Sequence, residues 1–177
     1  RTDSRWVRGA VSVAVCTALM WVGAAAAHDS NVPVSKAQQS ADVSSMRLQK
    51  VAADVYFVQG ESALGSTANR NFISNAGFVI TNDSVVVIDA LGSPALAEEV
   101  VKKIRTVTRK PISHVLLTHY HADHIYGLQV FAALGAKIVA NEQAREYINS
   151  ETAHLRLEAS RKDLAPWVND STRMVPA

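Results

Sequence analysis

The chain has 177 residues, a formal net charge of +2 and 48% hydrophobic residues, which is enough for a modest hydrophobic core. Three arginines and one aspartate lie in residues 1–27, and without them the formal charge is zero. The sequence therefore lacks the clustered basic face of most nucleic-acid-binding domains, and we expect no nucleic-acid partner. The single cysteine, Cys16, lies in the same stretch, so the remainder can form neither a disulfide nor a thiolate ligand.

Residues 1–27 have the three parts of a secretory signal peptide. Arg1, Arg5 and Arg8 are basic, residues 10–23 form an apolar run, and residues 24–27 are four alanines. A transmembrane helix needs about 20 apolar residues, so the run is short for one. We expect cleavage near Ala27, a periplasmic or secreted protein, and no membrane attachment after cleavage. An uncleaved membrane anchor is the alternative. Residues 28–46 are expected to form a polar linker.

Three strands are predicted after the linker. Residues 51–59, 76–81 and 84–89 are apolar and rich in β-branched or aromatic residues, and the pair Asn82-Asp83 marks a turn before the third. Between the first two strands lies a polar, glycine-bearing loop at residues 60–71. It is either a flap that contacts substrate, with Arg70 as a carboxylate clamp, or a solvated irregular hairpin.

Helical periodicity begins after residue 93. Ser93 is a suitable N-cap and Pro94 suits the first helical position, and the apolar residues that follow recur at helical spacing, namely Leu96, Val100, Ile104 and Val107. This stripe is expected to cover the sheet. Further on, the pattern predicts a buried strand, a helix, a strand and a helix-prone segment at residues 112–118, 127–134, 136–140 and 144–164. Alternating strands and helices indicate the α/β class.

The segment His119-Tyr120-His121-Ala122-Asp123-His124 holds three of the six histidines and a carboxylate directly after a predicted strand. A tight loop there can aim His119 and His121 at one ion, while Asp123 and His124 face a neighbouring ion. Neutral imidazole and carboxylate suit Zn²⁺, and Fe or Mn is compatible with the same ligands. The alternative is a polar strand end whose histidines are merely hydrogen-bonded.

Three further residues are ambiguous. Tyr120 lies between two candidate ligands and either hydrogen-bonds in the site or packs. His114 falls inside a predicted strand, which favours a core or edge position. His154 falls in a helix-prone segment, which favours a surface position over metal ligation.

The pattern His119-x-His121-x-Asp123-His124 after a hydrophobic strand resembles the signature of the metallo-β-lactamase fold superfamily. The apolar run that ends at Asp89 resembles the first motif of that family. The resemblance covers roughly residues 51–172 and implies an α/β fold, the αβ/βα four-layer sandwich. Residues 47–177 would be a truncated N-terminal part of that domain.

The resemblance also implies roles for the motif residues. Asp89 would hold the metal loop from outside the ligand set, as ligating histidines generally require. A first zinc ion would take His119, His121 and a histidine beyond residue 177. A second would take Asp123, His124 and two ligands also beyond residue 177, with Asp123 orienting the attacking hydroxide. The fragment itself is expected to be inactive.

The implied function is that of a metal-dependent hydrolase in which metal-bound hydroxide attacks an ester, thioester, lactone or β-lactam carbonyl of a small molecule. Because position 124 is histidine, the ligand set is more similar to those of the dinuclear thioester and lactone hydrolases than to that of the commonest β-lactamase subclass. Residues 75–89, together with export, are most similar to periplasmic quinoprotein relay system zinc metallohydrolases. A β-lactamase proper, an iron-dependent redox enzyme and a non-catalytic accessory protein remain alternatives. The oligomeric state is not predicted.

Overall fold

The computed structural model describes residues 46–177, so the expected signal peptide and nearly all of the expected linker lie outside the described residues. Helices and strands occur in the order β1 Leu48–Ala52, β2 Val55–Val58, β3 Ala76–Ile80, β4 Val85–Ile88, α2 Pro94–Val107, β5 Ile112–Leu116, α3 Ala122–Ile125, α4 Leu128–Ala133, β6 Lys137–Val139, α5 Glu142–Ile148 and α6 Glu151–Asp163.

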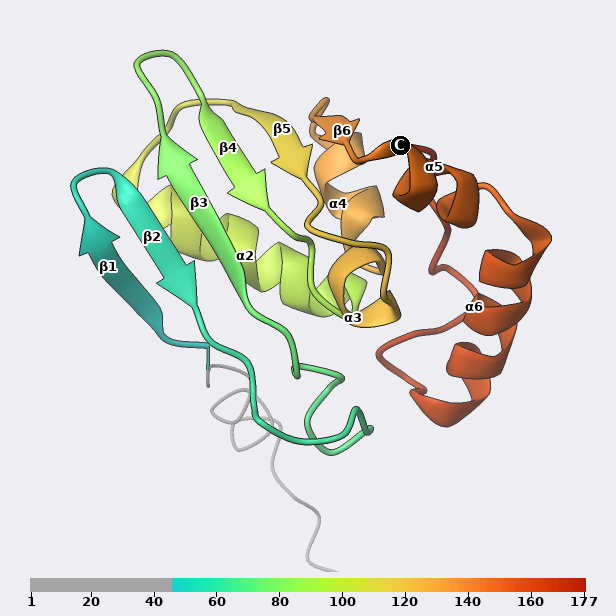
Figure 1. The fold of residues 1–177 in the computed structure, drawn as a ribbon. Helices are drawn as coiled ribbons and strands as arrows, with labels where there is room; N and C mark the ends of the chain where they lie inside the picture. The colour runs from blue at the N-terminus through green and yellow to red at the C-terminus, as the bar shows by residue number, and fades with distance from the viewer. Residues whose placement is uncertain (1–45) are drawn as a thin grey trace, which may run out of the picture.

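The six strands form one sheet in chain order, and the direction of pairing changes at β4 (Figure 1). Strands β1 to β4 pair antiparallel, while β4, β5 and β6 pair parallel through the connections that carry α2, α3 and α4. Ile88 and Leu116, the last residues of β4 and β5, are register partners. The loops that follow these two strands therefore leave the sheet side by side, and both carry candidate site residues.

One face of the sheet carries the hydrophobic core. Helix α2 runs behind the sheet, and α4 packs against α2, β5 and β6 (Figure 1). Alternate strand residues point to that face and are fully buried, as expected for strands with a period of two, including Val85, Val87 and Val115. The predicted helical stripe meets them, because Leu96, Val100 and Ile104 are also buried. The expected core role is confirmed for these three residues and is wrong for Val107, which ends α2 and is 39% exposed.

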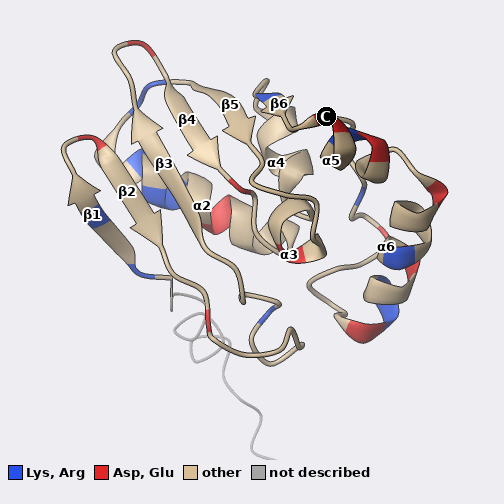
Figure 2. Ribbon diagram, viewed as in Figure 1, with Lys and Arg blue, Asp and Glu red and all other residues tan. Residues whose placement is uncertain are grey.

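The opposite face of the sheet is apolar and partly open in the described part of the chain. Leu116 and Val139 are 40% and 46% exposed. Figure 2 shows that β3, β4 and β5 carry no Lys, Arg, Asp or Glu, whereas α6 carries both signs of charge. The mixed α/β class is confirmed. Residues 46–177 contain one sheet and the helices that cover it, which are two of the four layers expected for the sandwich.

Two element boundaries differ from the sequence-based predictions. The strand predicted at residues 51–59 is in fact two strands, because Asp54 adopts φ 59° and turns the chain between them. Aspartate tolerates this left-handed conformation better than most residues. The helix-prone stretch 144–164 divides into α5 and α6, since Ser150 caps α6 by accepting a hydrogen bond from the Ala153 amide.

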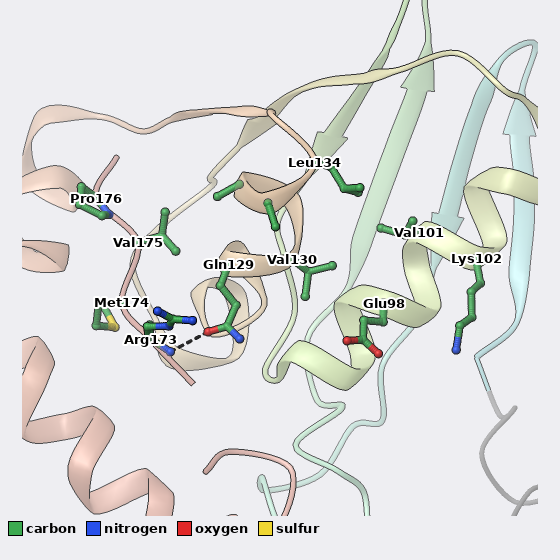
Figure 3. A pocket seen from close by; sticks show the side chains of 12 residues that line it. Glu98, Val101, Lys102, Gln129, Val130, Leu134, Arg173, Met174, Val175 and Pro176 are labelled. Atoms are coloured by element: carbon green, nitrogen blue, oxygen red, sulfur yellow. Dashed lines mark hydrogen bonds between the residues drawn. The ribbon is translucent and has the colours of Figure 1, made fainter. Parts of the chain in front are cut away.

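A groove of about 740 Å³ lies between α2, α4 and the C-terminal segment (Figure 3). Val101, Val130 and Met174 are among the residues that line it, and the Arg173 amide donates to Gln129 Oε1 at 2.7 Å across one wall. It shares no lining residue with the cavity beside the histidines that is described below. Within residues 46–177, no helix combines the length and hydropathy needed to cross a bilayer.

Candidate metal centre

The four candidate ligands lie together on the loop after β5 and on the short helix α3. His121 occupies the N-cap position of α3, and Asp123 and His124 lie in its single turn. The His119 ring centroid is 4.6 Å from that of His121 and 4.1 Å from that of His124. His124 Nε2 is 3.4 Å from Asp123 Oδ2. The structure therefore brings all four predicted side chains to one place.

Asp89, the residue that directly follows β4, stabilises this loop through hydrogen bonds. Its buried carboxylate accepts hydrogen bonds from the Thr118 amide at 2.9 Å and the Thr118 hydroxyl at 2.7 Å. It also contacts His124 Nδ1 at 2.8 Å. These contacts agree with the bracing role expected of Asp89, and they identify Thr118 as a partner that the sequence pattern did not indicate.

The same contacts determine which ring nitrogens remain for a metal. The Thr118 hydroxyl gives its proton to Asp89, so its oxygen accepts from His119 Nδ1, 3.0 Å away. His124 Nδ1 is likewise committed to Asp89. Each ring thus has its Nδ1 held by a neighbour and its Nε2 directed away from that neighbour, which is the arrangement in which a partner on one ring nitrogen orients the other toward a metal; His124 Nε2 also lies 3.4 Å from Asp123 Oδ2.

The backbone around Asp89 is tightly fitted to α3. Asp89 and Leu91 have φ values of 60° and 63°, a conformation unusual for residues other than glycine. The Ala90 amide donates to the His124 carbonyl at 2.9 Å, and the Gly127 amide donates to the Leu91 carbonyl at 3.2 Å. A Cβ atom at Gly127 would lie only 2.0 Å from the Ala90 oxygen. Gly127 is therefore required for the close approach of the two loops.

A third segment, just before β3, supports the metal loop from another side. The Ser74 hydroxyl donates a short hydrogen bond to the Asp123 carbonyl. Asn71 donates through Nδ2 to the Gly92 carbonyl at 3.0 Å, which joins the loop at residues 60–75 to the chain after Asp89. Neither contact is evident from the sequence, because the partners lie 49 and 21 residues apart.

Protonation in the metal-free site follows from these neighbours. Burial opposes the charged form of His124, but hydrogen bonds and charges from Asp123 and Asp89 prevail and raise its pKa to about 9. The hydrogen bond to His124 is the main reason that the pKa of Asp123 is lowered, although burial acts against it. Burial, followed by the charges of His124 and His121, lowers the pKa of His119. Metal ligation needs a neutral imidazole, so metal binding at His124 would release a proton.

The residues present fit a zinc site in donor chemistry, since imidazole nitrogen and carboxylate oxygen are its usual ligands besides thiolate. Among residues 46–177, however, no set of three His, Cys, Asp or Glu side chains is arranged to hold one ion. The four candidate ligands thus lie together, but within residues 46–177 they form no complete three-residue ligand set for one ion.

A cavity of about 750 Å³ opens beside the cluster, lined on one side by His121 and Asp123 and on another by α6. Tyr120 lines it as well, with its ring edge-on to His121 and 4.4 Å from the Tyr147 ring. Tyr120 thus packs against Tyr147, in agreement with the second of its two interpretations, and it also forms part of the cavity wall. Arg156 of α6 lines the cavity too and was missed from the sequence, where it is one charge among several on an exposed helix.

Three residues considered from the sequence lie away from the cluster. Arg70 does not act as a clamp, because it is 8% exposed and pairs with Glu99 of α2 at 3.1 Å. His114 contacts Ser113 in β5 at 2.9 Å. His154 is exposed on α6, as expected for a surface helix residue.

Comparison with known proteins identifies one family. A family model described as the metallo-beta-lactamase superfamily matches residues 69–173. A hydroxyacylglutathione hydrolase from Rhodobacter capsulatus is 46% identical over 57 residues, which is 32% of this chain and 20% of that protein. The chain therefore spans about a fifth of the length of this curated relative.

Two solved structures are similar to part of the chain. A metallo-beta-lactamase from Hirschia baltica has a TM-score of 0.47 at 18% identity, covering 67% of this chain and 49% of that one. The metallo-beta-lactamase FIM-1 from Pseudomonas aeruginosa in its mono-zinc form has a TM-score of 0.48 at 16% identity, covering 58% and 44%.

Proposed function

Because this chain belongs to the metallo-β-lactamase superfamily, we propose that the protein containing it is an exported, zinc-dependent hydrolase of small ester or thioester substrates. One observation carries the proposal. His119, His121, Asp123 and His124 converge at the carboxyl end of β5, where Thr118 and Asp89 hold Nδ1 of His119 and of His124. Two zinc ions would be held, each by two of these residues and by ligands outside the chain.

The chemistry divides between the metal and the protein. When bound, zinc lowers the pKa of a coordinated water to about 7 and polarises a carbonyl oxygen. Asp123 would supply a charged oxygen to the second ion and would orient the attacking hydroxide. Asp89 keeps the histidine rings oriented. Tyr120 and α6 form the wall against which the substrate lies, so they limit its access to the cluster.

Thioesters are the preferred substrate class because of a local similarity. The 57-residue match at 46% identity is to a protein named as a hydrolase of hydroxyacylglutathione. A β-lactam remains the competing substrate, since other members of the superfamily are lactamases.

The test uses full-length, zinc-loaded protein and three substrates with comparable reacting carbonyls: a glutathione thioester, 4-nitrophenyl acetate and a chromogenic cephalosporin. We expect turnover of the first two and loss of that turnover in Asp123→Asn. Turnover of the cephalosporin alone would replace the proposal with a β-lactamase. Purification with iron as the sole bound metal, and no hydrolysis of any substrate, would favour the redox alternative.

A further inference from the structure

Helix α6 presents a polar face to the cavity beside the metal cluster. Thr152, Arg156, Ser160 and Asp163 all line the cavity, at spacings of four, four and three residues. Residues three and four apart lie on the same face of a helix, so these side chains form one stripe. The side of α6 next to this stripe is anchored in the protein by Ala153 and Leu157, which are 1% and 2% exposed. The stripe is therefore held toward the site by packing.

Arg156 is the cationic side chain of that stripe. In the described part of the chain, its guanidinium takes part in no ion pair or side-chain hydrogen bond, in contrast to Arg161 of the same helix, which pairs with Glu158. One turn farther along α6, the Ser160 hydroxyl lies 2.9 Å from the Tyr126 hydroxyl. This contact joins α6 to Tyr126, the C-cap residue of the helix that carries Asp123 and His124, whereas the Arg156 side chain itself is exposed.

Asp163 is the opposing charge and must be considered. It lies seven residues beyond Arg156, about 10 Å farther along the helix axis, and forms no ion pair with it. The Tyr120 and Tyr147 rings provide an apolar wall between the metal loop and the start of α6. His121 and Asp123, the two aromatic rings and Arg156 line one cavity, so a ligand with a reacting carbonyl at the metal loop shares that cavity with the rings and with Arg156.

We propose that Arg156 is a specificity-determining residue that selects substrates with a carboxylate or similar anionic group on the acyl chain. This inference rests on the proposed hydrolase function and specifies its substrate class. Arginine suits the role because its planar guanidinium donates two parallel hydrogen bonds to a carboxylate. The contact lies away from the reacting carbonyl, so it binds ground state and transition state alike and acts on KM.

The kinetic test compares mono-4-nitrophenyl glutarate with 4-nitrophenyl valerate, which have acyl chains of equal length and differ in the terminal carboxylate. In the full-length protein, Arg156→Gln should raise KM for the glutarate ester about 10- to 100-fold, the range for a charge-assisted hydrogen bond, and leave the valerate ester unchanged. Arg156→Lys should restore part of the loss. Lys162→Gln is the matched control, because Lys162 is an exposed cation on α6 that does not line the cavity.

A binding experiment separates this proposal from the proposed activity. Glutaramate and valeramide carry an amide in place of the ester, and calorimetry measures their affinities without turnover. We expect glutaramate to bind about 10-fold more tightly in the unmodified protein and in Lys162→Gln, and the difference to vanish in Arg156→Gln. A difference that survives in Arg156→Gln would overturn the proposal, as would equal effects of Arg156→Gln on both esters. Absence of turnover with the expected binding pattern would refute only the hydrolase function.

Discussion

Two aspartates lie within the same cluster but have different roles. Asp123 is partly buried and its carboxylate is 3.4 Å from His124 Nε2, a nitrogen that would face a metal. Asp89 is buried and its carboxylate is occupied by Thr118 and by His124 Nδ1. One carboxylate can reach an ion, and the other is surrounded by the groups that it orients.

This difference predicts a ranking of variants in the full-length protein. His121→Ala should deplete the first metal site, and Asp123→Asn should reduce turnover by several orders of magnitude while one ion remains bound. Asp89→Asn should reduce activity about 10- to 100-fold, as is usual for residues behind the metal ligands. Steady-state kinetics and metal analysis of the three purified proteins test this order. Near-normal activity of Asp123→Asn with an inactive Asp89→Asn would reverse the two roles.

The pair Arg70–Glu99 supports a prediction about stability. The Arg70 and Glu99 side chains are only 10% and 11% exposed and lie 3.1 Å apart, joining the loop at residues 60–75 to α2. Arg70→Met leaves the Glu99 charge buried without this partner, which should cost about 3–5 kcal/mol of unfolding free energy. The double variant Arg70→Met/Glu99→Met should be more stable than Arg70→Met. Denaturant unfolding measures both, and strictly additive losses would show that the two side chains are not coupled.

At the level of the elements, the contact of the Asp89 loop with α3 and α4 depends on Gly127. A side chain there would bring its Cβ atom within 2.0 Å of the Ala90 oxygen. Gly127→Ala should destabilise the protein by about 1–3 kcal/mol, the cost of overpacking, and should also weaken zinc binding because Asp89 moves with Ala90. Thermal unfolding and zinc titration check both effects. Gly135→Asn is the control, since Gly135 has φ 84° in open space and asparagine tolerates that conformation.

The elements were largely predictable because their signals are local. The stripe Leu96, Val100 and Ile104 identified α2, and the apolar run before Thr118 identified β5. The turn at Asp54 was missed because it depends on one residue in a left-handed conformation within an otherwise uniform strand pattern. The four candidate ligands were found because they lie within six residues.

The rest of the site could not be predicted, because its contacts join distant parts of the chain. Ser74 reaches the Asp123 carbonyl across 49 residues, and Arg156 enters the cavity through the packing of α6. Arg70 shows the converse case. Its place in a polar loop left a carboxylate clamp open as one of two interpretations, while the fold buries it against Glu99.

At the scale of the whole molecule, one prediction concerns export. The basic start, apolar run and alanines of residues 1–27 predict removal of that segment, with the exported protein beginning close to His28. Mass spectrometry of the protein from the periplasm of an expressing bacterium would locate the new N-terminus. An intact segment 1–27 in that material would support the membrane-anchor alternative.

The parallel pairing of β4 with β5 also determines when the site can exist during folding. Asp89 and Thr118 are 29 residues apart, with α2 between them, so their contact forms only after this long connection has closed. Non-local pairings of this kind form slowly. Zinc would therefore bind late, stabilising the native state and not the transition state for folding. Stopped-flow measurements on the full-length protein should show that zinc slows unfolding and leaves the refolding rate unchanged, whereas faster refolding would mean that the metal helps to close the crossover.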